Sequence, residues 1–92
     1  MELTMKDLKQ CFKDAKRTKA LFIGVKISTR GSAGAEVIIN PSENFAAKLK
    51  YYKENYTDDL VLKKYDGIQI IDCAFGDCFD QIECAFEEEG GL

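Results

Sequence analysis

Residues 20–40 read ALFIGVKISTRGSAGAEVIIN, a pattern that predicts the first two strands of the sheet. Its first part, residues 20–28, is rich in β-branched and large apolar residues, which predicts a strand with one apolar face formed by Leu21, Ile23, Val25 and Ile27. Residues 29–34 are rich in turn-forming residues, and residues 35–40 return to the composition of a strand. We therefore expect these two strands to form a β-hairpin.

A helix is expected before this hairpin, from about Thr4 to Arg17. Thr4 and Asp7 have the spacing of a capping box, in which each side chain satisfies a backbone N–H group of the first turn. Apolar residues recur behind them at helical spacing and predict one buried face, made of Met5, Leu8, Cys11, Phe12 and Ala15. The helix is therefore predicted to be amphipathic.

A second helix is expected after the hairpin. Asn40 is a favourable cap, Pro41 suits the first helical position, and Glu43 falls in the first turn. The buried face is predicted from the spacing of Phe45, Leu49, Tyr52 and Tyr56. These signals predict a helix that runs from Pro41 to about Tyr56.

A second hairpin and a third helix are expected in the rest of the chain. Residues 60–65 (LVLKKY) and 68–75 (IQIIDCAF) flank Asp66-Gly67, a pair that suits a two-residue hairpin turn. Gly76-Asp77 then interrupts the strand pattern. A helix is predicted from Cys78 to Glu89, with its apolar positions at Cys78, Ile82, Ala85 and Phe86.

These elements predict one α+β domain over residues 1–92, in the order α-β-β-α-β-β-α. A chain of 92 residues, 46% of them apolar, has enough apolar surface for a single core. We expect a four-stranded, mostly antiparallel sheet covered by helices on one main face. The strand order is left open, and residues 90–92 are expected to form a frayed tail.

The composition excludes several classes of enzyme site. The chain has no histidine, so neither a Ser-His-Asp triad nor a histidine-based zinc site is available. The cysteines lack the C-x2-C spacing of zinc ribbons and of common iron–sulfur sites. We therefore expect no metal and no cofactor. The alternative from another class is a carboxylate-based, metal-dependent enzyme, for which the candidates are Asp72, Asp77 and Asp80.

The amino-terminal sequence and the apolar runs bear on location. The first residues lack the apolar core of a secretory signal, and no apolar run approaches the roughly 20 residues of a membrane-spanning helix. We therefore expect a cytoplasmic protein without membrane contact. Because the cytoplasm is reducing, we also expect the cysteines to be free thiols.

Charge is distributed unevenly along the chain. Residues 1–50 contain ten Lys or Arg and five Asp or Glu, whereas residues 51–92 contain three and eleven. No positive side chain follows Lys64, although eight carboxylates do. Blocks of like charge are typical of segments that interact with partners.

Two charged stripes are expected on the helices, one formed by Lys6, Lys9, Lys13 and Lys16 and the other by Asp80, Glu83 and Glu87. One interpretation is that both stripes are solvated outer faces that pair with each other across the domain. The other is that the acidic end binds a basic surface of another protein. The contact residues predicted for that binding are Asp72, Asp77, Asp80, Glu83, Glu87, Glu88 and Glu89, with Tyr51 as an exposed aromatic contact.

Direct nucleic-acid binding is the weaker interpretation. The lysines of the first helix, with Arg17 and Lys19, have the charge to follow a phosphate backbone, but the chain has a net charge of −3 and no recognition motif. An acidic surface instead fits an inhibitor that imitates nucleic acid and occupies a groove built for phosphates. A homodimer is also left as an alternative, because the two stripes have opposite charge and could pair either within one molecule or between two copies.

Residues 19–28 (KALFIGVKIS), residues 36–70 (EVIINPSENFAAKLKYYKENYTDDLVLKKYDGIQI) and the acidic end together resemble small uncharacterised proteins of Gram-positive bacteriophages and prophages. The resemblance covers most of the chain in composition, style and length, and it includes no specific motif. It implies a non-enzymatic role in modulating the host or countering its defences, similar in kind to that of anti-CRISPR proteins. It transfers no functional residue.

Overall fold

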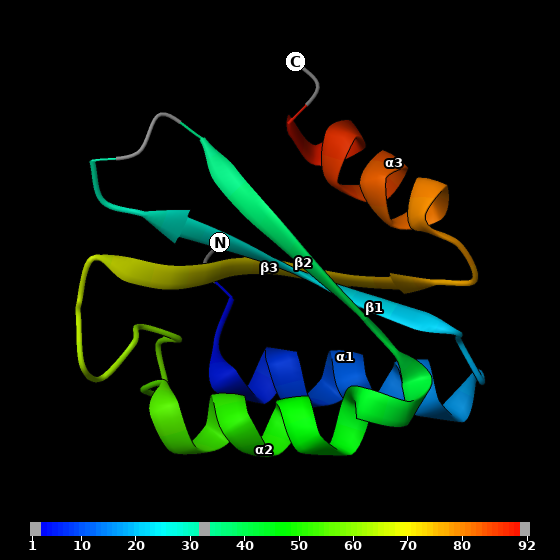
Figure 1. Cartoon of the computed structure of the whole chain (residues 1–92), viewed down its shortest axis with the longest axis horizontal. Coiled ribbons are helices and arrows are strands. Elements are labelled where there is room, and N and C mark those ends of the chain that lie inside the picture. The colour runs from blue at the N-terminus through cyan, green and yellow to red at the C-terminus, as the bar shows by residue number, and fades with distance from the viewer. Residues whose placement is uncertain (1–2, 32–33, 91–92) are drawn as a thin grey trace.

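The computed structural model describes residues 3–31 and 34–90, with the side chains of residues 3–31 and 34–86. The elements are the helix α1 (Met5–Arg17), the strands β1 (Phe22–Thr29) and β2 (Ala35–Pro41), a 3-10 turn η1 (Ser42–Asn44), the helix α2 (Phe45–Asn55), the strand β3 (Ile68–Gly76) and the helix α3 (Phe79–Gly90). The strands form one antiparallel sheet in the order β2-β1-β3 (Figure 1). The chain is thus α+β, as predicted.

Helix α1 begins where its local signals predict. The Thr4 backbone N–H donates to Asp7 Oδ2 at 3.0 Å, and the Asp7 N–H donates to Thr4 Oγ1 at 3.4 Å, so the capping box is confirmed. The residues of α1 that are buried are Met5, Leu8, Phe12 and Ala15. Cys11, predicted on the same face, is half-buried beside them.

The first hairpin is also confirmed. β1 and β2 pair antiparallel, from Phe22 opposite Pro41 to Ser28 opposite Ala35. Two details differ from the expectation. Leu21 lies outside β1 and is 53% exposed, so it does not share the buried face of the strand. Pro41 ends β2, and α2 begins only at Phe45 because the chain first makes the turn η1.

The predicted four-stranded sheet is wrong, because residues 60–65 do not form a strand. Leu60 has a positive φ of 63°, which breaks the extended conformation at the first residue of the predicted strand. The segment still bonds to β3: the Ile70 N–H donates to the Leu60 carbonyl, and the Leu62 N–H to the Ile68 carbonyl, both at 2.9 Å. Lys63 then donates its N–H to Asn55 instead, which limits the pairing to a short bridge.

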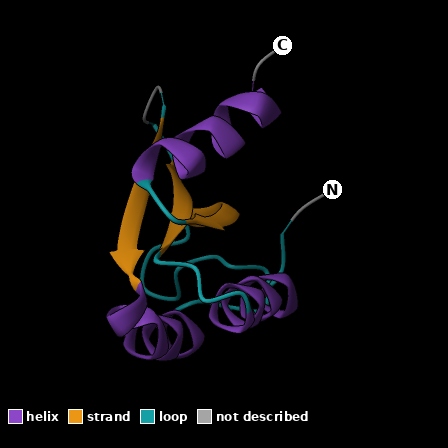
Figure 2. Ribbon diagram, turned by 90° about the vertical axis from the view of Figure 1, so that its right-hand side faces the viewer, coloured by secondary structure: helices purple, strands orange, loops and turns teal. Residues whose placement is uncertain are grey.

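Helices cover both faces of the sheet, and the expectation of one main covered face is therefore also wrong. Figure 2 shows α1 and α2 on one side, here called the α1/α2 face, and α3 on the other, the α3 face. The physical reason is that β1 is buried on both sides. Ile23, Val25 and Ile27 join the core with α1 and α2, whereas the alternate residue Gly24 contacts α3.

Glycine at position 24 allows α3 to lie close to the sheet. A Cβ atom there would lie 2.5 Å from Ile82 Cγ2 and 3.3 Å from the Phe86 ring. Ile82 and Phe86 are both buried, and they face the sheet at helical spacing. The side chains of α3 therefore pack directly against the backbone of β1 at Gly24.

The frayed tail predicted at residues 90–92 stays a prediction. Gly90 is the last residue of α3, and residues 91 and 92 lie outside the described residues. Within the described ranges, the helices are all too short or too polar to cross a lipid bilayer.

Candidate protein-binding surface

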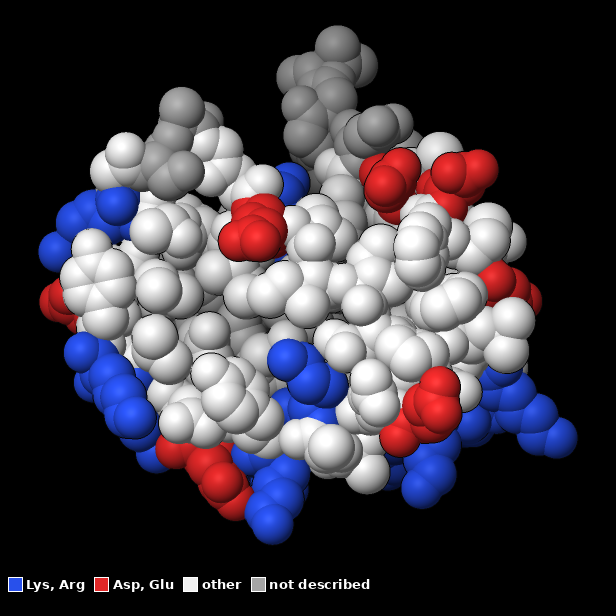
Figure 3. Space-filling model, in the orientation of Figure 1, with Lys and Arg blue, Asp and Glu red and all other residues white. Residues whose placement is uncertain are grey.

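The two charged helices lie on opposite sides of the sheet. The lysines of the α1 stripe, Lys6, Lys9, Lys13 and Lys16, are all exposed on the α1/α2 face. Figure 3 shows Lys and Arg mainly along the lower and left-hand edges, and acidic side chains over α3 at the upper right, with further acidic side chains among the basic ones along the lower edge. The lysines of the α1 stripe and the carboxylates of α3 thus lie on opposite sides of the sheet. Lys26 of β1 is a cation on the α3 side, opposite Asp72 of β3 and with its Nζ 5.8 Å from the Phe86 ring centroid.

Ion pairing does not connect the two helices in the described part of the chain. The ion pairs there join Arg17 to Asp14 at 3.4 Å and Arg30 to Asp66 at 3.6 Å, and both are solvent-exposed. Neither pair involves a residue of α3. The interpretation in which the two stripes neutralise each other within one molecule therefore finds no support among the described side chains.

Asp80 and Glu83 are the predicted contact residues that the structure places on the outer face of α3. Both are exposed, because Ile82 and Phe86 turn the opposite side of the helix toward the sheet. The backbone at positions 87–89 continues the helix. The side chains predicted there, Glu87, Glu88 and Glu89, lie outside the described residues.

Asp72 in β3 and Asp77 before α3 both make contacts with backbone groups. Asp72 Oδ1 accepts a hydrogen bond from the Cys73 N–H at 2.8 Å. Asp77 Oδ1 accepts from the Leu21 N–H at 3.4 Å, and the Asp77 N–H donates to Gln81 Oε1 at 2.6 Å. The contacts of Asp77 hold the connection from β3 to α3, and that of Asp72 lies within β3, so both carboxylates already have structural partners.

An aromatic residue that sequence reasoning missed lies beside the acidic residues. Phe79 is 54% exposed, and its ring packs edge-on against Phe22 with 5.0 Å between ring centroids. The neighbouring Leu21 is exposed as well. The sequence did contain a signal for Phe79, because Phe79, Ile82 and Phe86 recur at helical spacing. Cys78 was predicted at the first inward position of this helix, but it is exposed and precedes the helix.

Tyr51 is exposed, as expected of a contact residue, but it belongs to α2 on the other face of the sheet. Lys48 Nζ lies 5.2 Å from its ring centroid, in the geometry of a cation–π contact. The structure therefore does not bring Tyr51 together with the carboxylates of α3.

The cysteines are all free thiols. Cys11 on α1 and Cys73 on β3 are half-buried against the core. A hydrogen bond to Cys11, together with burial, raises the pKa of the Cys73 thiol. Because a thiol is reactive as the thiolate, this raised pKa lowers the reactivity of Cys73.

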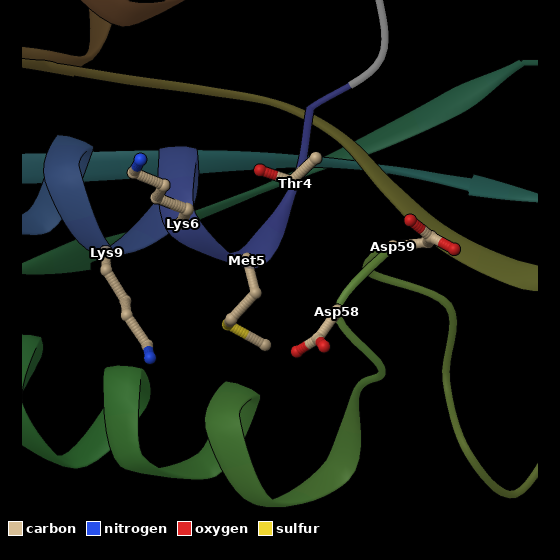
Figure 4. Close-up of a pocket in the computed structure, with 6 residues that line it drawn as sticks. All are labelled: Thr4, Met5, Lys6, Lys9, Asp58 and Asp59. Atoms are coloured by element: carbon tan, nitrogen blue, oxygen red, sulfur yellow. The ribbon is translucent and has the colours of Figure 1, made fainter.

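The hollows of the surface are shallow. The one in Figure 4 has a volume of about 360 Å³ and lies where α1 begins, lined by Thr4, Met5, Lys6, Lys9, Asp58 and Asp59. Lys9 and Asp58 point toward the space between α1 and α2 in this view, so the lining carries both signs of charge.

The carboxylates proposed for a metal-dependent enzyme are not gathered into a metal site. Across residues 3–31 and 34–86, the described side chains contain no group of three or more Asp, Glu, Cys or His residues placed to hold a metal ion. Asp72 and Asp77 instead bond to separate backbone groups. The structure thus adds nothing in favour of the enzymatic alternative.

Comparison of the chain with protein-family models, with curated proteins and with solved structures finds no match.

Proposed function

We propose that this protein is a non-enzymatic binding module that docks a cationic surface of another protein on the outer face of α3. One observation carries the proposal: α3 and the lysine stripe lie on opposite faces of the sheet, so α3 presents Asp80 and Glu83 to solvent, and neither forms an ion pair with a described side chain. A surface of one charge sign steers partners of the opposite sign and speeds their association.

An apolar anchor beside the carboxylates supports the same surface. Stable interfaces combine an apolar or aromatic centre with a polar rim, and aromatic residues supply much of the binding free energy. Phe79 gives such a centre, and Asp80 and Glu83 lie next to it along α3. We call these residues the α3 surface.

The resemblance to phage and prophage proteins suggests where this surface acts. It is consistent with a cytoplasmic inhibitor or modulator of a host defence protein. A partner whose cationic groove normally holds nucleic acid would present the complementary charge, and the module would then compete with nucleic acid for that groove.

Affinity capture from a bacterial lysate, with the captured proteins identified, tests the proposal. The doubly reversed variant Asp80→Lys/Glu83→Lys should lose a partner that the unaltered protein captures at low salt and releases as salt rises. The matched control is Glu43→Lys/Glu54→Lys, which changes the net charge equally at exposed sites of η1 and α2. Equal capture by both variants, or equal loss, contradicts a role for the α3 surface.

A second pair of variants tests the anchor. Phe79→Ala should weaken capture of the same partner by about tenfold or more, because it removes the exposed ring at the centre of the surface. Tyr51→Ala, which removes an aromatic ring of similar exposure on the other face, should leave capture unchanged. Circular dichroism establishes that both variants are folded. The reverse pattern would move the contact surface to α2.

A further inference from the structure

The two outer edges of the sheet differ. On β3, the segment Leu60–Leu62 bonds to Ile68 and Ile70, and Asp72 accepts a hydrogen bond from the Cys73 N–H. On β2, no other segment within residues 3–31 and 34–90 pairs with the edge that faces away from β1. An unpaired strand edge is a template for another strand, so this side of the molecule has unused bonding capacity.

The register shows which groups of β2 point outward. The Ser42 N–H donates to the Leu21 carbonyl at 2.8 Å, next to the pair Phe22–Pro41. Because facing residues of an antiparallel pair alternate between bonded and unbonded positions, the N–H and C=O groups of Val37 and Ile39 point away from β1. Pro41 falls in the same outward series, where its missing N–H costs no bond to β1.

The centre of β2 lacks the usual protection of an edge strand, although Glu36 and Pro41 lie on either side of it. Natural edges carry charges, bulges or prolines along their length, whereas β2 has the uncharged run Val37-Ile38-Ile39 at its centre. Val37 is 36% exposed. β2 is the strand nearest the viewer in Figure 1, and the space-filling view of that side shows a broad area without charge, with charges around its rim (Figure 3).

We propose that β2 pairs with β2 of a second copy of this chain, antiparallel, with Ile38 on the two-fold axis. Two three-stranded sheets then become one continuous sheet. In this register Val37 faces Ile39 of the second copy through outward backbone groups, and Glu36 faces Asn40 of that copy. The carboxylate meets an amide donor and not a like charge, so the strand is complementary to itself.

The register centred on Ile38 is preferred over its neighbour. A shift that places Val37 on the axis sets Glu36 opposite Ile38, which leaves the carboxylate against an apolar side chain. It also loses the partner for Asn40. The residues on either side of the axis therefore favour a second copy of this chain as the partner of β2, and they favour the register centred on Ile38.

The helices are compatible with this dimer. A two-fold axis perpendicular to the sheet puts both copies of α3 on one face and both copies of α1 and α2 on the other. Since α3 contacts β3 and β1, its carboxylates lie away from the axis at β2, and the two acidic helices do not meet there. The dimer would display two α3 surfaces side by side on one face.

Analytical ultracentrifugation over a concentration series tests the dimer. We expect the 10.4 kDa chain to associate to twice this mass as concentration rises. Val37→Lys should remain monomeric, because it places a charge in the uncharged run at the interface. Ile71→Lys is the matched control, since Ile71 is an exposed β-branched residue of the opposite edge strand, and it should dimerise like the unaltered chain. A monomer at all concentrations, or equal behaviour of the two variants, overturns the proposal.

Cysteine cross-linking tests the register independently of that variant. With the exposed Cys78 and Cys84 replaced by serine, Ile38→Cys should form an intermolecular disulfide under mild oxidation. The reason is that an unbonded facing pair has Cα atoms about 4.5 Å apart, within disulfide range. Ile39→Cys should not, because it faces Val37 of the second copy. Equal cross-linking of both variants, or none from Ile38→Cys, contradicts pairing centred on Ile38.

Discussion

The two faces of the sheet are covered to different depths. On the α1/α2 face, two helices enclose a continuous core that includes Leu8, Ile23, Tyr52 and Ile70, each at most 1% exposed. On the α3 face, one helix packs through Ile82 and Phe86, and Phe79 at its start stays exposed. Stability therefore resides mainly on the first face, and the second face is left to present the α3 surface. This difference can be tested by substitutions on each side.

The largest expected effect comes from the α1/α2 face. Leu8 is fully buried at the centre of α1, so Leu8→Ala should lower the free energy of unfolding by about 3 kcal/mol through lost burial and the cavity left behind. In a domain of this size the melting temperature should fall by roughly 15 °C. Thermal unfolding followed by circular dichroism measures the shift. A fall no larger than that of Ile82→Ala on the α3 face would contradict the asymmetry.

A smaller and more local effect is expected on the α3 face. Gly24→Ala places a methyl group against Ile82, whose β-branched side chain has little rotamer freedom in a helix, so α3 must shift at a cost of about 1–3 kcal/mol. Amide hydrogen exchange should accelerate about tenfold or more in α3 and stay unchanged in α1. Gly34→Ala is the control, because a Cβ there meets no atom within 4 Å. Faster exchange in both helices would show that the faces are not independent.

The smallest effect should be stabilising. The Tyr52 hydroxyl is buried without a hydrogen-bond partner in the described structure, so Tyr52→Phe should raise the free energy of unfolding by about 1 kcal/mol. Burial raises the pKa of Tyr52, so the folded state favours the neutral phenol. The unfolded chain therefore ionises first, and stability falls as pH rises above about 10.

Denaturant unfolding at neutral and alkaline pH measures both parts of this prediction. The advantage of Tyr52→Phe should grow above pH 10, because the substituted chain has lost the ionising group. Tyr56→Phe is the comparison, since burial raises the pKa of Tyr56 as well, whereas its hydroxyl is not among the buried, unpartnered atoms. A destabilised Tyr52→Phe would mean that the hydroxyl has a partner in solution.

The elements that sequence reasoning predicted correctly are those specified by nearby residues. Thr4 and Asp7 define the start of α1 within one turn, and the glycine-rich turn joins two strands that pair directly. The prediction of a fourth strand at residues 60–65 was wrong because the conformation of this segment depends on groups distant in sequence. The Lys63 N–H donates to the Asn55 carbonyl, and Leu60 adopts a positive φ, which is unusual for leucine and cannot be predicted from its residue type.

The candidate surface was predictable to a similar extent. Helical spacing predicts that Asp80 and Glu83 face outward, and both are exposed. Asp72 and Asp77 carry the same charge, but their backbone partners lie on other segments or follow from local geometry that charge patterns do not encode. The position of α3 on its own face depends on Gly24, where the informative feature is a missing side chain.

Because the lysines of α1 and the carboxylates of α3 lie on opposite sides of the sheet, these two groups together form an electric dipole that runs across it. The field of a cationic partner exerts a torque on such a dipole before any atoms touch. The protein would rotate until α3 faces the partner, so a larger fraction of random collisions would occur in the orientation that allows binding.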